Sequence, residues 1–350
     1  MRNFPAAMIL MLLVVSSVEG ISFFGGLFLE AKGVFYAPQV VEAYDRYERL
    51  RHPVTGWPPT EPDRKHHLDE TGSRFVPAFR HTRVSCLSLY GDSFTYSAEV
   101  DDEHAWGNVL ARKLGCRVSN FGIGGFGTDQ AYLRYLHSEP DGAPVVLLGH
   151  TAENIVRNSN QLRGLVAHGT EYGLKPRFVL DGQGGLKLIP LPTPSEAEFR
   201  QLVVRPSRYL KEEYFLPGGS SGNRTLGFPY SLAVFGAFRN EHIVARVRGE
   251  PRHSPFYAAD HPTRGLEVTA RIMEAFAPEA GRLGQRVVLA ILPTGRDLEY
   301  FNDRGRWIYE SLIKRLEAVG PEVAATGRPG FDAGSSPDCT TPLREFRGLL

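Results

Sequence analysis

The stretch Leu87-Ser88-Leu89-Tyr90-Gly91-Asp92-Ser93-Phe94-Thr95-Tyr96 joins an apolar run to a Gly-Asp-Ser turn. Such a run predicts a buried strand that stops at a tight turn and leads into a helix. Ser93 would then lie at the helix N-terminus, where free backbone N–H groups gather. A hydroxyl in that position is exposed above the edge of the sheet, as a nucleophile needs to be. The alternative is an N-cap serine, which carries no chemistry.

Predicted strands and helices alternate on both sides of this stretch. Apolar runs predict strands at Val84–Tyr90, Arg117–Phe121, Ala143–Leu148, Arg286–Leu292 and Glu322–Ala325. The remaining pattern predicts helices at Ala105–Leu114, Thr128–His137 and Leu266–Phe276, and a largely helical region at Asp297–Val319 around a turn at Asp303–Gly305. This order is typical of an α/β fold built on a parallel sheet.

The chain divides into three parts: an apolar N-terminus at 1–30, a proline-rich lead-in at 31–83 with a helix at Val40–Arg51, and an α/β domain at 84–350. A long insertion interrupts the domain at about 157–259. It contains a predicted β-hairpin, formed by Phe178–Leu180 and Leu186–Ile189, and it can cover a site at the edge of the sheet.

Composition describes an ordinary globular protein. The 350 residues carry 40 Lys and Arg against 39 Asp and Glu, a net charge of +1, which offers no basic surface for nucleic acid. Cys86, Cys116 and Cys339 are widely spaced, so we expect neither a cysteine metal site nor a disulfide framework. At most one pair can form, and the sequence leaves the partners open. We expect no metal and no other cofactor.

The N-terminus has two interpretations. Ala6–Val18 is an almost unbroken apolar run, and Ile21–Leu29 continues it after Glu19-Gly20. The segment is either a cleaved signal peptide, which makes the protein secreted, or an uncleaved anchor with Glu19 near mid-membrane. We favour a retained anchor, with the domain on the periplasmic or extracellular side. A buried core helix is the third interpretation, disfavoured because the segment is not amphipathic.

Three predicted strands end in groups that can bind an oxyanion. Ser93 follows the first strand, the glycine-rich Asn120–Thr128 follows the second, and Gly149–Asn154 follows the third. Parallel sheets bind ligands at the carboxyl ends of their strands. A hydroxyl nucleophile, a backbone donor and a carboxamide donor on adjacent strand ends are the parts of an oxyanion hole.

The glycine turn also matches another pattern. Gly122-x-Gly124-x-x-Gly127 fits the dinucleotide fingerprint, between a strand and a helix. That fingerprint needs an acidic residue at the end of the next strand, where this chain has Leu148-Gly149-His150. The fingerprint also occurs in the first βαβ unit of a sheet, whereas this turn does not belong to the first unit. We therefore rank nicotinamide binding well below hydrolysis.

On these blocks the chain resembles the SGNH (GDSL-type) hydrolase family, from about residue 84 to 326. The resemblance implies a three-layer α/β/α flavodoxin-like fold. It also implies Ser93 as nucleophile and the Gly125 N–H as an oxyanion donor. The third donor falls on Asn154 or Glu153, since the family's Gly-x-Asn-Asp reads here Gly-His-Thr-Ala-Glu-Asn. The following Ile155–Arg163 resembles exported bacterial relatives with a hydrophobic N-terminus.

The family's general base is missing from its expected place. The resemblance implies an Asp-x-x-His block after the last strand, but no histidine follows Ala325, so we expect a truncated or frameshifted end. Asp63–His66 and Asp101–His104 match the pattern and are expected on the surface. Asp260-His261 is expected to cap the next helix. His150 is expected to be a pocket-lining or satisfied polar residue, with base function as the alternative.

These observations lead to one expected function and two alternatives. We expect a serine esterase that acts on a small ester, such as an O-acyl group on a carbohydrate, through Ser93, Gly125 and Asn154. The missing histidine favours a catalytically impaired binding module at the cell surface instead. Acyl transfer to a polysaccharide would use the same residues as hydrolysis.

Overall fold

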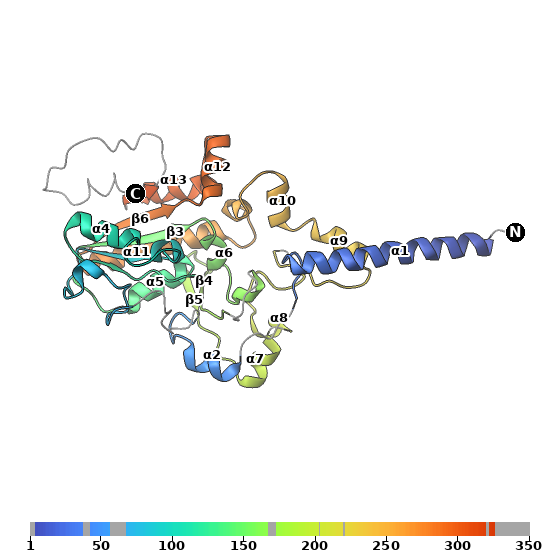
Figure 1. Ribbon diagram of the computed structural model, residues 1–350, viewed down its shortest axis with the longest axis horizontal. Helices are drawn as coiled ribbons and strands as arrows, with labels where there is room; N and C mark the ends of the chain where they lie inside the picture. The colour runs from blue at the N-terminus through green and yellow to red at the C-terminus, as the bar shows by residue number, and fades with distance from the viewer. Residues whose placement is uncertain are drawn as a thin grey trace.

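The computed structural model describes residues 4–37, 43–56, 68–166, 173–202, 204–219, 221–319 and 322–325. Its centre is a five-stranded, entirely parallel sheet formed by β1 (Leu87–Tyr90), β2 (Val118–Asn120), β3 (Val145–Thr151), β6 (Arg286–Leu292) and β7 (Glu322–Ala325). The strand order is β2-β1-β3-β6-β7. The paired strands β3 and β6 are labelled in Figure 1. The chain therefore reverses its direction of travel across the sheet between β1 and β3, where open parallel sheets bind ligands.

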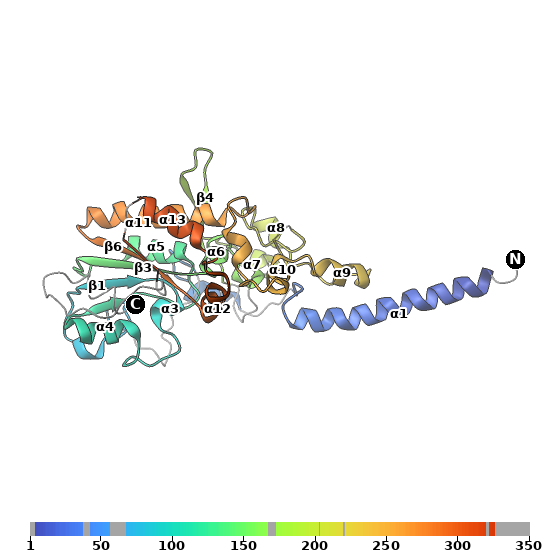
Figure 2. The same ribbon diagram turned by 90° about the horizontal axis from the view of Figure 1, so that it is seen from above.

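Helices cover both faces of this sheet (Figure 2). One face packs against α5 (Thr128–His137), α11 (Gly265–Arg282) and α13 (Glu310–Val319), and the other against α4 (Trp106–Leu114). Successive strand residues alternate between the two cores: Leu147 packs on the α4 side, and Val146 and Leu148 on the α11 side. All seven residues of β3 are buried, which confirms the expectation of a strand covered on both faces.

Most predicted elements are present, with shifted ends. The helix expected at Leu266–Phe276 continues to Arg282, because the fully buried Ala280 extends its apolar face past Pro278. The helical region expected at Asp297–Val319 is two helices, α12 (Gly295–Arg304) and α13. Gly305, at φ +66°, ends the first of them, as a left-handed C-terminal cap does.

The insertion is richer in helices than the sequence predicts. It holds the expected antiparallel hairpin, β4 (Arg177–Leu180) and β5 (Leu186–Ile189). It also holds α7 (Glu196–Leu202), α8 (Pro206–Tyr209), α9 (Tyr230–Ala237), α10 (Glu241–Val247) and the 3-10 turn η3 (Ser254–Tyr257). The chain passes into it through α6 (Asn154–Asn158) and the 3-10 turn η2 (Arg163–Leu165). The buried pair of Lys175 with Asp129 ties the insertion to α5.

The lead-in contributes two short elements, α2 (Tyr44–Leu50) and the 3-10 turn η1 (Pro77–Phe79). The helix expected at Val40–Arg51 begins at Tyr44, because Ala43 before it is extended. Residues 40–42 of the expected helix lie outside the described part of the chain. Tyr47 of α2 stacks on Phe199 of α7 with ring centroids 4.6 Å apart. The lead-in therefore packs against the insertion.

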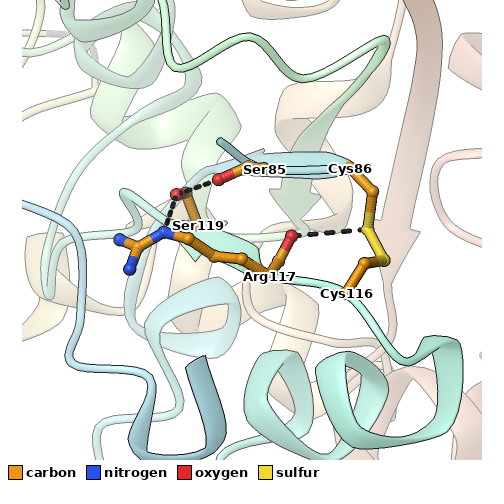
Figure 3. Close-up of a disulfide and its surroundings, with 5 residues drawn as sticks. All are labelled: Ser85, Cys86, Cys116, Arg117 and Ser119. Carbon is orange, nitrogen blue, oxygen red and sulfur yellow. Dashed lines mark hydrogen bonds between the residues drawn. A yellow bond between two sulfur atoms is a disulfide. The ribbon is translucent and has the colours of Figure 1, made fainter. Parts of the chain in front are cut away.

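A disulfide joins Cys86 to Cys116 across the starts of β1 and β2 (Figure 3). The two Cα atoms are 6.0 Å apart, and Cys86 Sγ lies 3.3 Å from the carbonyl oxygen of Arg117. Ser85 and Ser119 hydrogen-bond beside it at 2.7 Å. The sequence allowed one pair without identifying it, and the fold brings these two cysteines together through the register of β1 on β2.

The apolar N-terminus is one continuous helix, α1 (Phe4–Ala31), which projects from the domain (Figures 1 and 2). Glu19 does not interrupt it. Ala6–Ala31 is long and apolar enough to cross a membrane, a property that signal sequences share. Its large apolar side chains from Met8 to Val18 are roughly half exposed, so the interpretation as a buried core helix is wrong.

Candidate functional site

Ser93 opens α3 (Ser93–Tyr96), directly after β1. Asp92 is the N-cap, and its carboxylate accepts the Phe94 N–H at 2.9 Å. The structure therefore gives the N-cap role to Asp92 and leaves the partly exposed Ser93 at the first helical position. The Ser93 N–H is among the first amides of the helix, which have no acceptor within it.

Close packing requires glycine at position 91, directly before this turn. A Cβ on Gly91 would overlap the Thr95 hydroxyl, and so would a Cβ on Gly149 of β3. Thr95 is fully buried between these two strand ends. The first turn of α3 is thus pressed onto the sheet edge, which holds Ser93 above the strand ends.

The turn after β2 approaches α3 closely. Asn120 accepts the Gly122 N–H at 3.0 Å and donates to the Thr95 carbonyl oxygen at 2.7 Å. A Cβ on Gly122 would lie 2.6 Å from the Tyr96 nitrogen, so only glycine fits there. Gly125 has φ +83°, and its N–H donates no backbone hydrogen bond within the described residues.

These contacts argue against the dinucleotide interpretation. A pyrophosphate would need the free N–H groups at the start of α5. The Asp129 N–H instead donates to the Asn158 side chain at 3.1 Å, and the Gly127 N–H to the Gln130 side chain at 3.3 Å. A Cβ on Gly127 would overlap the Asp129 carboxylate. The glycines at 122 and 127 are thus explained by packing.

Arg157 of α6 joins the three strand ends. Its Nη1 donates to the Phe126 carbonyl oxygen at 2.8 Å and to Asn154 Oδ1 at 3.2 Å, and lies 3.6 Å from Asp92 Oδ2. Those groups follow β2, β3 and β1 respectively. The segments that carry Ser93, Gly125 and Asn154 therefore converge around one guanidinium. Its other terminal nitrogen pairs with Glu153.

The orientation of the Asn154 carboxamide follows from this contact. An arginine can only donate, so the atom that faces it must be the carboxamide oxygen. The Asn154 Nδ2 then points away from Arg157, is buried, and has no hydrogen-bond partner among the described residues. Burying an amide donor without a partner costs about 1–3 kcal/mol. Such a group calls for a functional explanation.

Between the two residues that the sequence left open, the geometry favours Asn154. Glu153 is about one-third exposed and is paired with Arg157, whereas Asn154 is fully buried with a free donor. Asp92 is also fully buried and accepts the Thr151 hydroxyl at 2.6 Å. A carboxylate that accepts hydrogen bonds from Thr151 and Phe94 is a fixed structural anchor beside Ser93.

His150 is a satisfied polar residue of the core. The Tyr257 hydroxyl donates to the Ala152 carbonyl oxygen at 3.1 Å, so its oxygen is free to accept from His150 Nε2 at 2.9 Å. His150 Nδ1 then accepts from the Thr128 hydroxyl at 2.7 Å. Burial lowers the pKa of His150 to about 3, so the ring stays neutral. Both nitrogens are occupied, which argues against the alternative role as base.

None of the other histidine motifs within the described residues hydrogen-bonds to Ser93. His104 and Asp101 form an exposed pair, as expected for a surface motif, and Asp63–His66 lies outside the described residues. The expectation that Asp260-His261 caps α11 is wrong: His261 bonds to Thr263 and Glu241, and α11 begins after Arg264. The hydroxyl of Thr263 lies beside the first amide of α11 instead.

His253 is a residue that sequence analysis passed over. It lies just before η3, which packs against α6, and its buried Nδ1 has no partner within the described parts of the chain. Burial and the nearby charges of His242, Arg252 and Arg157 hold the pKa of His253 well below its ordinary value. No sequence motif marks this histidine, because only the folded insertion brings it toward Arg157.

No described histidine hydrogen-bonds to Ser93. Residues 326–350, where the resemblance implies a base, are outside the described part. Within that part, no cluster of three or more His, Cys, Asp or Glu residues is arranged to hold a metal ion. Comparison with protein-family models and with curated protein sequences finds no match.

Proposed function

We propose that this chain is an SGNH-type serine esterase that hydrolyses a small ester, such as an O-acyl group on a carbohydrate. Ser93 Oγ attacks the acyl carbon, the ester C–O bond breaks and the alcohol leaves with the serine proton, and water then hydrolyses the acyl-serine to the free acid. The developing oxyanion accepts hydrogen bonds from the Ser93 N–H, the Gly125 N–H and Asn154 Nδ2. The fold supports the proposal, because the order β2-β1-β3-β6-β7 is the doubly wound order 2-1-3-4-5 of flavodoxin-like sheets. Ser93 and Asn154 follow β1 and β3, the two strands that flank its switch point, and Gly125 follows β2, the neighbour of β1.

The observation that carries the proposal is the unpartnered Asn154 amide. It is fully buried, its oxygen accepts a hydrogen bond from Arg157, and its Nδ2 has no partner within the described residues, at the point where three strand ends converge. Donors that are fixed before the reaction act most strongly in a site that excludes water. Arg157 is thus a positioning residue, which fixes the carboxamide orientation and offsets the charge of the buried Asp92.

We place the enzyme outside the cytoplasm, anchored by α1. The Cys86–Cys116 disulfide supports this location, because disulfides persist in oxidising compartments. The apolar length of α1 supports the anchor. Secretion after cleavage of α1 is the alternative.

The test of the activity is the hydrolysis of p-nitrophenyl acetate by the full chain and by Ser93→Ala. We expect hydrolysis by the wild type and its loss in the variant. Equal rates would exclude Ser93 as the nucleophile.

A second candidate is a non-catalytic binding module with the same fold. It is favoured by one observation, that no histidine of the described residues hydrogen-bonds to Ser93. Such a module binds an acylated glycan and leaves it intact. Polysaccharide O-acyltransfer uses the esterase residues, and product analysis with a glycan acceptor separates it from hydrolysis.

A further inference from the structure

The insertion contains an apolar segment that packs along α1. Leu226–Phe238 has no charged side chain. The chain runs outward along α1 from Asn223 and returns as α9 (Figures 1 and 2). Asn240 donates to Asn223 at 2.8 Å and closes the base, and Asn223 donates to the Gly33 carbonyl oxygen at the end of α1. We call residues 224–239 the apolar hairpin.

One face of α1 packs against this hairpin. Glu19, Phe23 and Gly26 are partly or fully covered, at the spacing of one helix face, while Phe24 and Leu27 beside them are exposed. The Phe23 and Tyr230 rings lie 4.9 Å apart. A Cβ on Gly26 would lie 2.5 Å from Leu226 Cδ1, so glycine permits the close approach.

Glu19 satisfies the polar groups at the tip of the hairpin. Its carboxylate accepts the Tyr230 N–H at 2.6 Å, the Ser231 N–H at 3.3 Å and the Ser231 hydroxyl. Pro229, the residue before them, has no N–H to satisfy. A charged side chain within an apolar span needs a partner, and backbone in lipid needs internal hydrogen bonds. This contact meets both requirements at once.

The opposite side of the hairpin is apolar and exposed. Phe228 is 75% exposed, and Leu232, Phe235 and Phe238 are between 58% and 66% exposed. Large apolar surfaces of this kind mark interaction sites. Because α9 packs directly against α1, a lipid environment around α1 also reaches the hairpin.

The depth of the hairpin follows from the geometry of α1. A span of about 20 residues crosses the hydrocarbon layer, and counted from Ala6 it ends near Gly25. Glu19 is then about 9 Å inside that boundary. The tip of the hairpin lies at this depth, whereas Leu226, opposite Gly26, lies at the boundary. This is the depth of an interfacial apolar element.

Cationic side chains lie at the base of the hairpin. Lys32 lies 5.7 Å from the ring centroid of Phe28, and Arg239 lies 5.8 Å from that of Phe235. The Arg224 guanidinium lies against Gly236. Such side chains place their charges among lipid headgroups while their stems cover apolar surface.

We propose that the apolar hairpin is a second membrane element, re-entrant in the leaflet on the domain's side, packed on a retained α1 and capped by Glu19. The inference rests on the membrane-anchoring part of the proposed function and is independent of the esterase chemistry. Two membrane contacts fix the orientation of the domain, which a single spanning helix alone does not do.

The test uses the full chain in vesicles of phosphatidylcholine and phosphatidylglycerol. Nitroxide labels are attached at Phe228→Cys and Phe235→Cys, each combined with Cys339→Ser so that the other cysteines are in the disulfide. Leu188→Cys is the matched control, because Leu188 is an exposed apolar residue of the insertion on β5. Leu12→Cys reports on α1. Collision rates with oxygen, which enters lipid, and with a water-soluble nickel chelate give the depth of each label.

We expect the labels at 228, 235 and 12 to meet oxygen more often than the nickel chelate, and the label at 188 to show the reverse. We also expect Phe23→Cys and Tyr230→Cys to form a disulfide in the same vesicles. The hairpin proposal would be overturned if the label at 12 were embedded in lipid while the labels at 228 and 235 were as accessible to the nickel chelate as the label at 188. That result would leave the anchor intact. Aqueous labels at all positions would overturn the anchor as well.

Discussion

The Asn154→Ala variant tests the proposed oxyanion hole, because we expect it to lower the rate of catalysis far more than the stability of the fold. Asn154→Ala removes one proposed oxyanion donor, which costs about 2.7–4 kcal/mol of transition-state stabilisation, or about 10²–10³ in kcat. The same change removes a buried amide donor without a partner, whose burial costs about 1–3 kcal/mol, and one hydrogen bond from Arg157 of similar worth. These two stability effects oppose each other. We therefore expect a large loss of rate with a small change in unfolding free energy.

Asn158→Ala is the matched control on the same helix. Asn158 is as buried as Asn154, but its amide is satisfied by Thr269 and Asp129. We expect this variant to lose stability and to keep its rate per folded molecule. Asn154→Asp keeps an acceptor for Arg157 and cannot donate to an oxyanion, so it should fold and be inactive.

The assay is kcat/KM for p-nitrophenyl acetate, with urea unfolding of the same preparations. If Asn154→Ala retained activity within threefold of the wild type, the assignment of its amide to the oxyanion would be refuted. A loss of rate that only followed the unfolded fraction would refute it equally.

Two further predictions concern the core. His150 has a pKa of about 3 in the folded state and an ordinary value near 6.5 when unfolded. Protons therefore bind the unfolded chain preferentially, and stability falls by about 1.4 kcal/mol for each pH unit between pH 6.5 and pH 3. The unfolding free energy, measured with urea, should therefore differ less between pH 7 and pH 5 in His150→Gln than in the wild type. The exposed His104→Gln is the control, and the same difference in His150→Gln as in the wild type would contradict the prediction. The Cys86–Cys116 disulfide closes a loop of 30 residues and should contribute about 3–4 kcal/mol, so Cys86→Ser with Cys116→Ser should unfold at a lower midpoint temperature, and an unchanged midpoint would show that the disulfide is dispensable.

The parallel sheet was largely predictable because its signals are local. The strands around Leu89, Leu147 and Leu289 are apolar runs bounded by turns, and Gly115 and Gly305 mark the ends of helices. The β4–β5 hairpin has the same kind of signal. The resemblance to SGNH hydrolases also directed attention to Ser93 and Asn154, although it could not say which of Glu153 and Asn154 is buried.

The remaining features depend on contacts between distant segments. No catalytic motif marks Arg157, and its contacts exist only because three strand ends meet at its guanidinium. Leu226–Phe238 is too short for a membrane span and has no amphipathic pattern, so the packing of α9 on α1 was not visible in the sequence. The partner of Glu19 could not be predicted for the same reason, because Ser231 is more than two hundred residues away.

The central claim is that Ser93 is a nucleophile beside a working oxyanion hole. The most direct test is reaction of the full chain with a fluorophosphonate probe, followed by peptide mapping by mass spectrometry. We predict that the probe is found on Ser93 and that Asn154→Ala reacts much more slowly than the wild type. An unmodified Ser93 in folded protein, or labelling that persists in Ser93→Ala, would contradict the claim.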